Sequence, residues 1–522
     1  MRSRGRRHIL ARREDSHSRG ETVAAARPNI LLITTDQQRG DALGIDGNPT
    51  LRTPVLDGLA RAGIWFRNAY SEAPVCVPMR SCWMTGRHPL ALGQNRWRGD
   101  PFTRGEILPD ALSAAGYRTG VFGKRHFSPA REPYGFDEML IHESGRMGAD
   151  REMDDDYLAY LRRETDWGGY SRGHGVGNND VYAAASLIPE PEHVSSWTAG
   201  ESVGFLERHA RERPDQPFFC WCSFNKPHSP YDPPHPYDTL YGPQDVPAPA
   251  VMPNGVDDEL PVNQRRIRHY TWQTIGEEQM RASLAYYYGL ITHIDVCVGR
   301  LVQALMRLGL RDDTIIAFTS DHGDMMGDHN QYFKTTFYEG SARVPYVFYL
   351  PERVRDEREV SVTGRVAAPV GVSSLMPTLL DLAAVPKPAT ADGDTLLDAM
   401  RGGEAPNDGE VAAAYGLLPE QCGPGHSAML RWDRYKYIYW QPGACGQLFD
   451  VEADPGELND LADVDGYREM AAEAHTRLER RLGGYAYGRS EVLSDGTLVG
   501  ALFSPPDSWS APVKGPWGRR PM

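Results

Sequence analysis

The sequence predicts an α/β fold, with a large, mostly parallel, helix-covered sheet and a smaller α+β subdomain toward the C-terminal end. Short apolar runs rich in β-branched residues alternate with segments of helical spacing, which is typical of parallel sheets built from βα units. The runs at 29–35 and 314–319 have almost no charged or flexible residues, as expected of strands buried on both faces. After about residue 400 the pattern changes to short strands followed by one helix.

The first predicted elements are a strand and a helix. The strand, residues 29–35 (NILLITT), ends in Asp36. Thr53 and Pro54 suit the cap and first residue of a helix that Gly63 would end. The elements expected next alternate between the two types: helix 107–115, strand 117–122, helix 196–210, strand 217–224, helix 276–309 and strand 314–319.

Two long segments interrupt this alternation. Residues 143–195 and 228–265 are rich in Gly, Pro and acidic side chains, so we expect insertions that shape the rim of a pocket. In the C-terminal part we expect strands at 426–431, 435–440 and 446–450 and a helix at 465–482. The predicted domains are an Arg-rich disordered leader or misplaced start (1–27), the α/β domain (28–400), the α+β subdomain (401–489) and an irregular tail (490–522).

Composition excludes several classes of protein. The formal net charge of -14 and the pI near 5.6 argue against a protein that mainly binds nucleic acid or an anionic membrane. We see no run of about 20 apolar residues that would form a signal sequence or a membrane span, and therefore expect a cytoplasmic protein. The seven cysteines are few, and they fit a reducing compartment. Cys220 and Cys222 lie in a predicted buried strand, where small apolar side chains are a better interpretation than a redox pair.

The segment Cys76-Val77-Pro78-Met79-Arg80 places a nucleophilic side chain at a predicted helix start. Pro78 can open the helix and Gly86 can close it. The helix N-terminus favours an anion, and Arg80, one turn further on, can point to the same place. The alternative is a buried cysteine before an ordinary helix, and this short pattern alone does not decide between the two.

Other polar residues follow predicted strands. Lys124 and His126 follow 117–122 in a Gly-Lys-Arg-His turn, which lacks the glycine spacing of a phosphate-binding P-loop and by itself suits a solvated basic turn. Asp36 and the Asp321-His322 pair offer ligands for a metal ion.

His228 follows another predicted strand, and Lys334 lies beyond the Asp321 loop. Taken singly, His228 reads as structural and Lys334 as a surface charge. Asp324 and Asp328 read as turn residues or as supports around a metal site. Four predicted strand ends nevertheless deliver Asp36, Lys124, His228 and Asp321 to one expected sheet edge, which favours a shared site.

The chain resembles the formylglycine-dependent sulfatases of the alkaline phosphatase superfamily from about residue 28 to about residue 463. The motifs occur in family order: PNILLITTDQQRGDALG, CVPMR with MTGRHP, GYRTGVFGKRH, PFFCWCSFNKPHSPYDPP, TSDHGDMMGDHNQYFK, KYIYW and QLFDVEADPGELNDLAD. The resemblance implies hydrolysis of small-molecule sulfate esters to an alcohol or phenol and inorganic sulfate. It also implies a formylglycine-generating enzyme as a partner, which oxidises Cys76 to formylglycine.

The resemblance also assigns roles to individual residues. Asp36, Gln37, Asp321 and His322, with the modified Cys76, would hold a divalent cation, usually Ca²⁺, although Mg²⁺ or Mn²⁺ would suit these ligands too. Arg80 and Lys124 would bind the sulfate oxygens. His228 and Lys334 would assist the leaving oxygen, and His126 would act as the base that expels sulfate and restores the aldehyde.

Four positions depart from the commonest family pattern. Gln37 replaces a second aspartate and His322 replaces an asparagine, a combination shared by choline sulfatases and phosphonate monoester hydrolases. The loss of one anionic ligand keeps phosphonate monoesters and phosphodiesters open as an alternative substrate class. Met79 and Arg125 replace the more usual Ser or Ala and Trp.

Two competing interpretations remain at this stage. Gly169-Tyr170-Ser171-Arg172-Gly173 matches the nucleophile elbow of α/β-hydrolases, but Thr165–Gly168 supplies no apolar strand before it. Without oxidation of Cys76, the chain could instead be a binding scaffold for sulfate or phosphate esters. The sequence leaves open the identity of the substrate and the oligomeric state, a homo-oligomer included.

Overall fold

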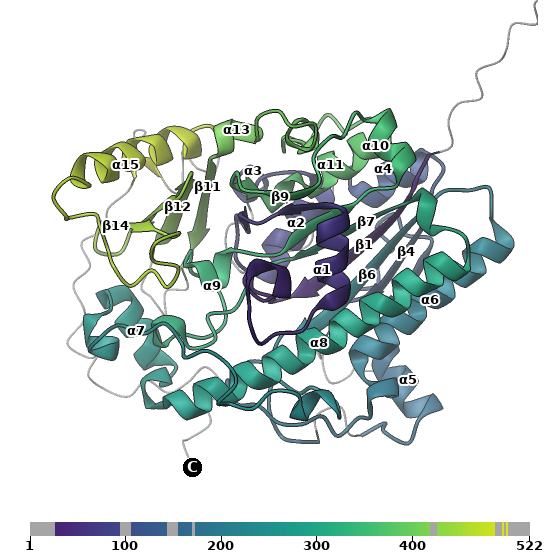
Figure 1. Ribbon diagram of the computed structural model, residues 1–522, viewed down its shortest axis with the longest axis horizontal. Helices are drawn as coiled ribbons and strands as arrows, with labels where there is room; N and C mark the ends of the chain where they lie inside the picture. Colours follow the sequence, from purple (N-terminus) through teal and green to yellow (C-terminus); the bar gives the residue numbers. More distant parts are fainter. Residues whose placement is uncertain are drawn as a thin grey trace, which may run out of the picture.

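The computed structural model describes residues 27–93, 106–143, 155–169, 173–417 and 425–485, with the backbone of 493–494 and 497–498. Figure 1 shows a large twisted sheet covered by helices on both faces and, beside it, a smaller sheet covered by one long helix. This arrangement confirms the predicted α/β fold with a second, smaller α+β unit. The predicted leader, most of the predicted tail and parts of the first predicted insertion lie outside the described residues. The predicted domain boundaries stay predictions.

The large sheet has eight strands in the order β5-β4-β6-β1-β7-β8-β2-β9. The five strands from β5 to β7 are all parallel, whereas β8 runs antiparallel to both of its neighbours. In sequence order the strands are β1 (Asn29–Asp36), β2 (Ile64–Phe66), β4 (Arg118–Gly123), β5 (Glu138–Ile141), β6 (Phe218–Pro227), β7 (Thr314–Ser320), β8 (Tyr346–Tyr349) and β9 (Gly364–Val366). A short parallel pair, β3 (Ala69–Tyr70) and β10 (Val370–Gly371), lies apart from this sheet.

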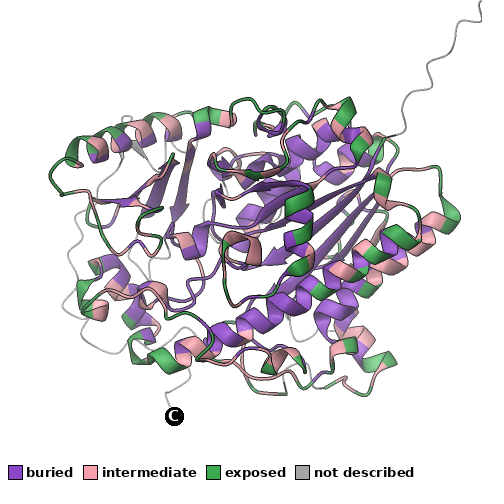
Figure 2. Cartoon of the chain, in the orientation of Figure 1, coloured by how far each residue is buried: buried purple, intermediate pink, exposed green. Residues whose placement is uncertain are grey.

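Two apolar layers pack helices against the sheet. One face is covered by α1 (Pro54–Ala62), α6 (Val194–Glu212) and α8 (Glu277–Arg307). The other face is covered by α2 (Cys76–Thr85), α4 (Leu108–Ala114) and α11 (Leu375–Leu382). Figure 2 shows the central parallel strands β1, β6 and β7 as buried along their length, which explains why their sequences are apolar on both faces.

Shorter helices border these layers and the loops between them: α3 (Pro89–Leu92), α5 (Asp156–Glu164), α7 (Pro261–His269), α9 (Glu339–Ala342), α10 (Glu352–Glu357), α12 (Leu397–Met400) and α13 (Pro406–Gly409). Within the described part of the chain, α8 is the one helix whose length and composition would allow it to cross a membrane. It packs against α1, α6 and β6. Most of its apolar stretch is buried inside the protein, as in the core helix of a globular fold.

The smaller unit is an antiparallel sheet of β11 (Val411–Gly416), β12 (His426–Trp432), β13 (Tyr435–Trp440) and β14 (Cys445–Asp450), covered by α15 (Arg468–Leu482). Three of these strands lie close to their predicted positions. β11 was not predicted, because its alanine-rich sequence VAAAYG suits a helix as well as a strand. A last pair, β15 (Leu493–Ser494) and β16 (Thr497–Leu498), lies in the predicted tail.

Candidate active site

Four parallel strands end at one edge of the large sheet. β4, β6, β1 and β7 are consecutive neighbours in the sheet. Asp36 is the last residue of β1, while Lys124, His228 and Asp321 directly follow β4, β6 and β7. The prediction that these strand ends share one edge is confirmed, and ligands of open α/β sheets bind at such an edge.

Position 123, the last residue of β4, requires glycine. Gly123 has a φ of +94°, and a Cβ at this position would lie 2.0 Å from the carbonyl oxygen of Ser223 on the neighbouring strand. Any larger residue would therefore push β4 away from β6 and displace the lysine.

Cys76 is the first residue of α2, as predicted, and Gly86 ends the helix in the left-handed conformation. Val75, which precedes the helix, offers no side-chain cap, so no side chain occupies the N–H groups of the first turn. Cys76 is 2% exposed and its helix is buried on almost every side. The positive end of a buried helix therefore faces the sheet edge, where it favours an anion.

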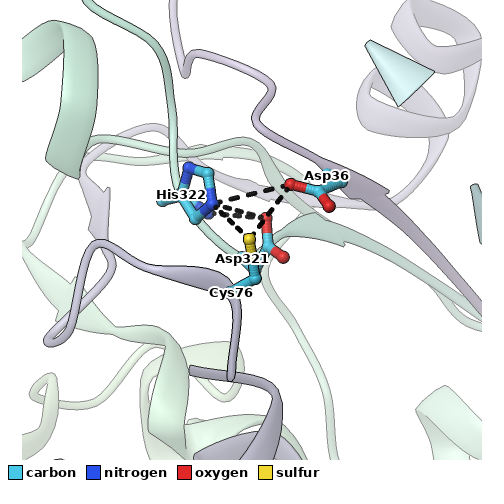
Figure 3. Close-up of side chains that lie close together, drawn as sticks. All are labelled: Asp36, Cys76, Asp321 and His322. Carbon is cyan, nitrogen blue, oxygen red and sulfur yellow. Dashed lines mark hydrogen bonds and ion pairs between the residues drawn. The ribbon is translucent and has the colours of Figure 1, made fainter. Parts of the chain in front are cut away.

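Figure 3 shows the side chains of Asp36, Cys76, Asp321 and His322 converging on one point. One ligand atom from each lies within 4.8 Å of the others, and all four residues are buried. The Cys76 sulfur is 3.2 Å from Nε2 of His322 and 3.6 Å from Oδ1 of Asp36.

The imidazole of His322 is oriented for metal binding. Its Nδ1 lies 2.8 Å from the carbonyl oxygen of Gly323, to which it donates, so the lone pair of Nε2 points into the cluster. Two buried carboxylates and one such imidazole are a suitable donor set for a divalent cation. Despite burial, the charge of Asp321 raises the pKa of His322, so a proton and a metal ion would compete for Nε2.

Three cations surround the cluster. Arg80, fully buried, donates from Nε to Asp321 (2.7 Å) and from Nη1 to Ser223 Oγ (2.9 Å) and to the Lys124 carbonyl (2.8 Å). Its other terminal nitrogen, Nη2, is buried without a partner in the described structure. An unpartnered guanidinium N–H beside an empty helix start suits a ligand oxygen.

The lysines contact the cluster directly. The Lys124 ammonium forms a very short ion pair with Asp36. The Lys334 ammonium lies 3.3 Å from the sulfur of Cys76 and 2.8 Å from the amide oxygen of Gln37, to which it donates. Both lysines therefore place a positive charge close to Cys76, where it would stabilise an anionic ligand.

These charges set the ionisation of the acidic groups. Burial alone would raise the pKa of Asp36, but the positive charges of Lys124, Lys334 and Arg80 together hold it well below its usual range. The pKa of the Cys76 thiol is lowered to about 7, because Lys334, Lys124 and His322 outweigh burial and the charge of Asp36. A side chain at this position can therefore carry negative charge near neutral pH.

Gln37 takes part in the site in a different way from the four clustered residues. It adopts a φ of +73°, its N–H donates to Asp321 Oδ1 (3.1 Å), and its side-chain amide donates to Asp324 (2.5 Å). Its amide oxygen accepts from Lys334, so its role as a metal ligand stays a prediction.

The two predicted histidines outside the cluster lie at the same sheet edge. His228 donates from Nδ1 to the Ser229 carbonyl (2.7 Å), and burial, together with Lys334 and Lys124, keeps its pKa well below the usual range. His126 is buried, with a φ of +68°, and its N–H donates to Glu143 (2.8 Å). These contacts fix the ring of His228 and the backbone of His126, and they leave the chemical roles of both residues as predictions.

Sequence reasoning missed several supporting residues. Ser223 binds Arg80, and Glu143 accepts from the N–H groups of Arg125 and His126. Nothing in the local sequence around Ser223 or Glu143 distinguishes them, since their partners are distant in the chain.

Asp324 agrees with its predicted supporting role, since its carboxylate accepts from Gln37, Tyr231 and the backbone of Phe333. Asp328 accepts from Arg39 and from the Ala250 N–H. Ser171 of the candidate nucleophile elbow lies outside the described residues, but helix α5 and a turn precede it instead of the strand that an elbow requires.

Comparison with known proteins gives consistent matches. The sulfatase family matches residues 28–385, and the family of the N-sulphoglucosamine sulphohydrolase C-terminal region matches residues 327–482. An arylsulfatase of Clostridium perfringens is 33% identical over 490 residues, covering 91% of this chain and 97% of the relative. A choline-sulfatase of Rhizobium meliloti is 31% identical, covering 88% of each chain.

Among solved structures, a phosphonate monoester hydrolase of Agrobacterium radiobacter superposes with a TM-score of 0.71 at 25% identity. The match covers 92% of this chain and all of the other.

Proposed function

Because this chain belongs to the sulfatase family and is a sulfuric ester hydrolase, we propose that it cleaves sulfate esters with a formylglycine made from Cys76, at a divalent metal held by Asp36, Asp321 and His322. The observation that carries this proposal is the buried convergence of these residues at the start of α2. Ca²⁺ is the expected ion, with Mg²⁺ or Mn²⁺ as alternatives that the same donors accept.

The two absent groups fit the residues around them. Formylglycine in hydrated form would supply a hydroxyl to attack sulfur and a second hydroxyl through which the aldehyde is restored, while a metal ion would polarise the nucleophile and the sulfuryl oxygens. Position 76 lies at a helix start beside three cations, where a negatively charged nucleophile is stabilised.

Arg80 and Lys124 bind the sulfuryl group in this proposal. The free Nη2 of Arg80 has a hydrogen to donate to a sulfuryl oxygen, and its other contacts hold the guanidinium rigid. Such fixed donors stabilise charge that develops in the transition state without reorganisation.

Lys334 assists the leaving oxygen. Its ammonium already lies beside Cys76 and has protons to donate, whereas burial, with the charges of Lys334 and Lys124, keeps the pKa of His228 low and its imidazole neutral in the ligand-free protein. An anionic substrate would offset Lys334 and Lys124 and thereby favour protonation of His228. We assign His126 to the final step as the base that expels sulfate.

Phosphonate monoesters and phosphodiesters are the second candidate substrate class. Gln37 removes one negative charge from the commonest family ligand set, and a phosphonate monoester hydrolase is among the structures most similar to this chain.

For cellular context, we propose a formylglycine-generating enzyme as the maturation partner. We also propose a cytoplasmic location, which the five free thiols other than Cys76 among the described residues support.

A panel of aryl and alkyl sulfates, phosphate diesters and phosphonate monoesters tests the proposal. kcat/KM is measured for each ester on protein whose formylglycine content has been determined by mass spectrometry. We expect the highest value for a sulfate ester. A clear preference for a phosphonate monoester would contradict the proposed substrate class while leaving the site intact.

A further inference from the structure

The loop that carries Lys334 has an unusual backbone. We call residues 321–335, which follow β7, the Lys334 loop. Its non-glycine residues with positive φ, between 48° and 77°, are Met326, His329, Asn330, Phe333 and Thr335. This backbone conformation is strained for a residue with a side chain, so the loop keeps its shape only if its surroundings hold it.

His329 contacts two acceptors that come from outside the loop. Its Nδ1 lies 2.9 Å from Oε1 of Glu259, and its Nε2 lies 3.0 Å from the carbonyl oxygen of Gly456. The ring is 2% exposed and stacks on Tyr338, with 4.1 Å between ring centroids and 11° between planes. A neutral imidazole has one N–H, so only the imidazolium can donate to both acceptors.

We propose that His329 is a positioning residue: as an imidazolium it clamps the Lys334 loop between Glu259 and Gly456, and so holds the Lys334 ammonium beside Cys76. The inference rests on the proposed function for its catalytic consequence. It goes beyond the reaction itself, because it makes the smaller C-terminal unit, which supplies Gly456, part of the apparatus that places a catalytic lysine.

The segment that contains Glu259 also contacts Lys334 directly. Glu259 lies two residues before the start of α7, and Arg266 of α7 donates a short hydrogen bond to the carbonyl oxygen of Lys334 itself. Asn263, also in α7, donates to Glu259 (3.2 Å) and thereby fixes its carboxylate. Release of His329 would therefore loosen the attachment of the Lys334 backbone to α7.

The charges around His329 favour its protonated form. Burial opposes protonation, but the hydrogen bond and charge of Glu259, with the charges of Glu457 and Asp328, raise the pKa of His329 above its usual value. Asp328 is paired with Arg39 and Glu457 with Lys436, and Tyr338 presents only its ring face. These charges keep the imidazolium to a higher pH than in an ordinary histidine, and the clamp opens as pH rises through the pKa of His329.

Nuclear magnetic resonance of histidine-labelled protein tests the charge state without any measurement of activity. The His329 signals are assigned by their loss in His329→Gln. We expect both ring nitrogens to carry protons at neutral pH and the titration to occur above pH 6.5, the ordinary midpoint for histidine. A neutral His329 ring at neutral pH would overturn the clamp, whatever the enzyme hydrolyses.

Kinetics then test the positioning role. In His329→Gln, one donor and the charge are lost, and we expect kcat/KM for an alkyl sulfate to fall by about ten- to a hundredfold, a loss typical of a misplaced catalytic group. The loss should be much smaller for 4-nitrophenyl sulfate, whose leaving group needs no proton. Equal losses for both esters would overturn the positioning role.

Glu259→Gln gives an independent check, because it keeps a hydrogen-bond acceptor while it removes the negative charge. The alkaline limb of the alkyl sulfate pH profile should move down by about one pH unit, as expected when an imidazolium loses its charged partner. An unmoved limb would contradict the proposal.

The matched control is His475→Gln. His475 also pairs with a glutamate, Glu479 (3.3 Å), but on α15 and away from the Lys334 loop. This variant should keep the wild-type profile. A change equal to that of His329→Gln would show that any His–Glu pair has this effect, which also contradicts the clamp.

Discussion

Replacing Arg80 by lysine tests the proposed sulfuryl-binding group while a positive charge is kept. The Arg80 guanidinium makes three hydrogen bonds and offers Nη2 to a ligand. A lysine nitrogen can keep the ion pair with Asp321 but cannot also reach Ser223 and the Lys124 carbonyl. Two hydrogen bonds at about 1 kcal/mol each correspond to a loss of about 2 kcal/mol in the free energy of unfolding.

The expected loss of activity is larger than this loss of stability. Removing one fixed donor to a developing negative charge costs about a hundred- to a thousandfold in rate. kcat/KM for 4-nitrophenyl sulfate should therefore fall by about that factor in folded Arg80→Lys protein. The assay requires equal formylglycine content in variant and wild type.

Arg431→Lys is the matched control for this variant. Arg431 is also fully buried, and it donates to the hydroxyl of Tyr70 and to carbonyl oxygens of β12 and β13 and the turn that joins them. Its replacement should cost comparable stability and leave kcat/KM unchanged. If Arg80→Lys lost stability but kept wild-type kcat/KM, the assignment of Arg80 to the sulfuryl group would be refuted.

Three further predictions concern Lys334, Asp321 and the buried carboxyl group of Glu72. Lys334→Met should lower kcat/KM by about 10²- to 10⁴-fold for alkyl sulfates and far less for 4-nitrophenyl sulfate, and a loss independent of the leaving group would contradict its role. Asp321→Asn should weaken metal binding by more than about a hundredfold, measured as metal retained after dialysis, and full retention would exclude this ligand. Burial raises the pKa of Glu72 to about 7, so wild-type stability should fall as pH rises from 4.5 to 7. Glu72→Gln should remove about 3 kcal/mol of this dependence in urea unfolding, and an unchanged slope would refute the shift.

The strand ends were predictable because each is a local pattern. Apolar, β-branched runs stop at Asp36 and Asp321, and the parallel arrangement follows from the alternation with helices. The short strands β2, β8 and β9 were not predicted, since three or four residues give too little periodicity to recognise.

The supports of the site were not predictable, because their partners are distant in sequence. Ser223 lies in a buried, mostly apolar strand, yet its hydroxyl accepts a hydrogen bond from Arg80. His329 reads as part of an Asp- and His-rich loop, and only the fold reveals that Glu259 and Gly456 flank its ring. Such contacts depend on tertiary packing, which a single sequence does not display.

The most direct test of the account is the mass of the peptide that contains Cys76, measured together with the activity of the same preparation. We expect the mass of an aldehyde in place of a thiol, a kcat/KM that scales with the aldehyde fraction, and no sulfatase activity in Cys76→Ala. Full sulfatase activity in a preparation whose position 76 is entirely thiol, or in Cys76→Ala, would contradict the account.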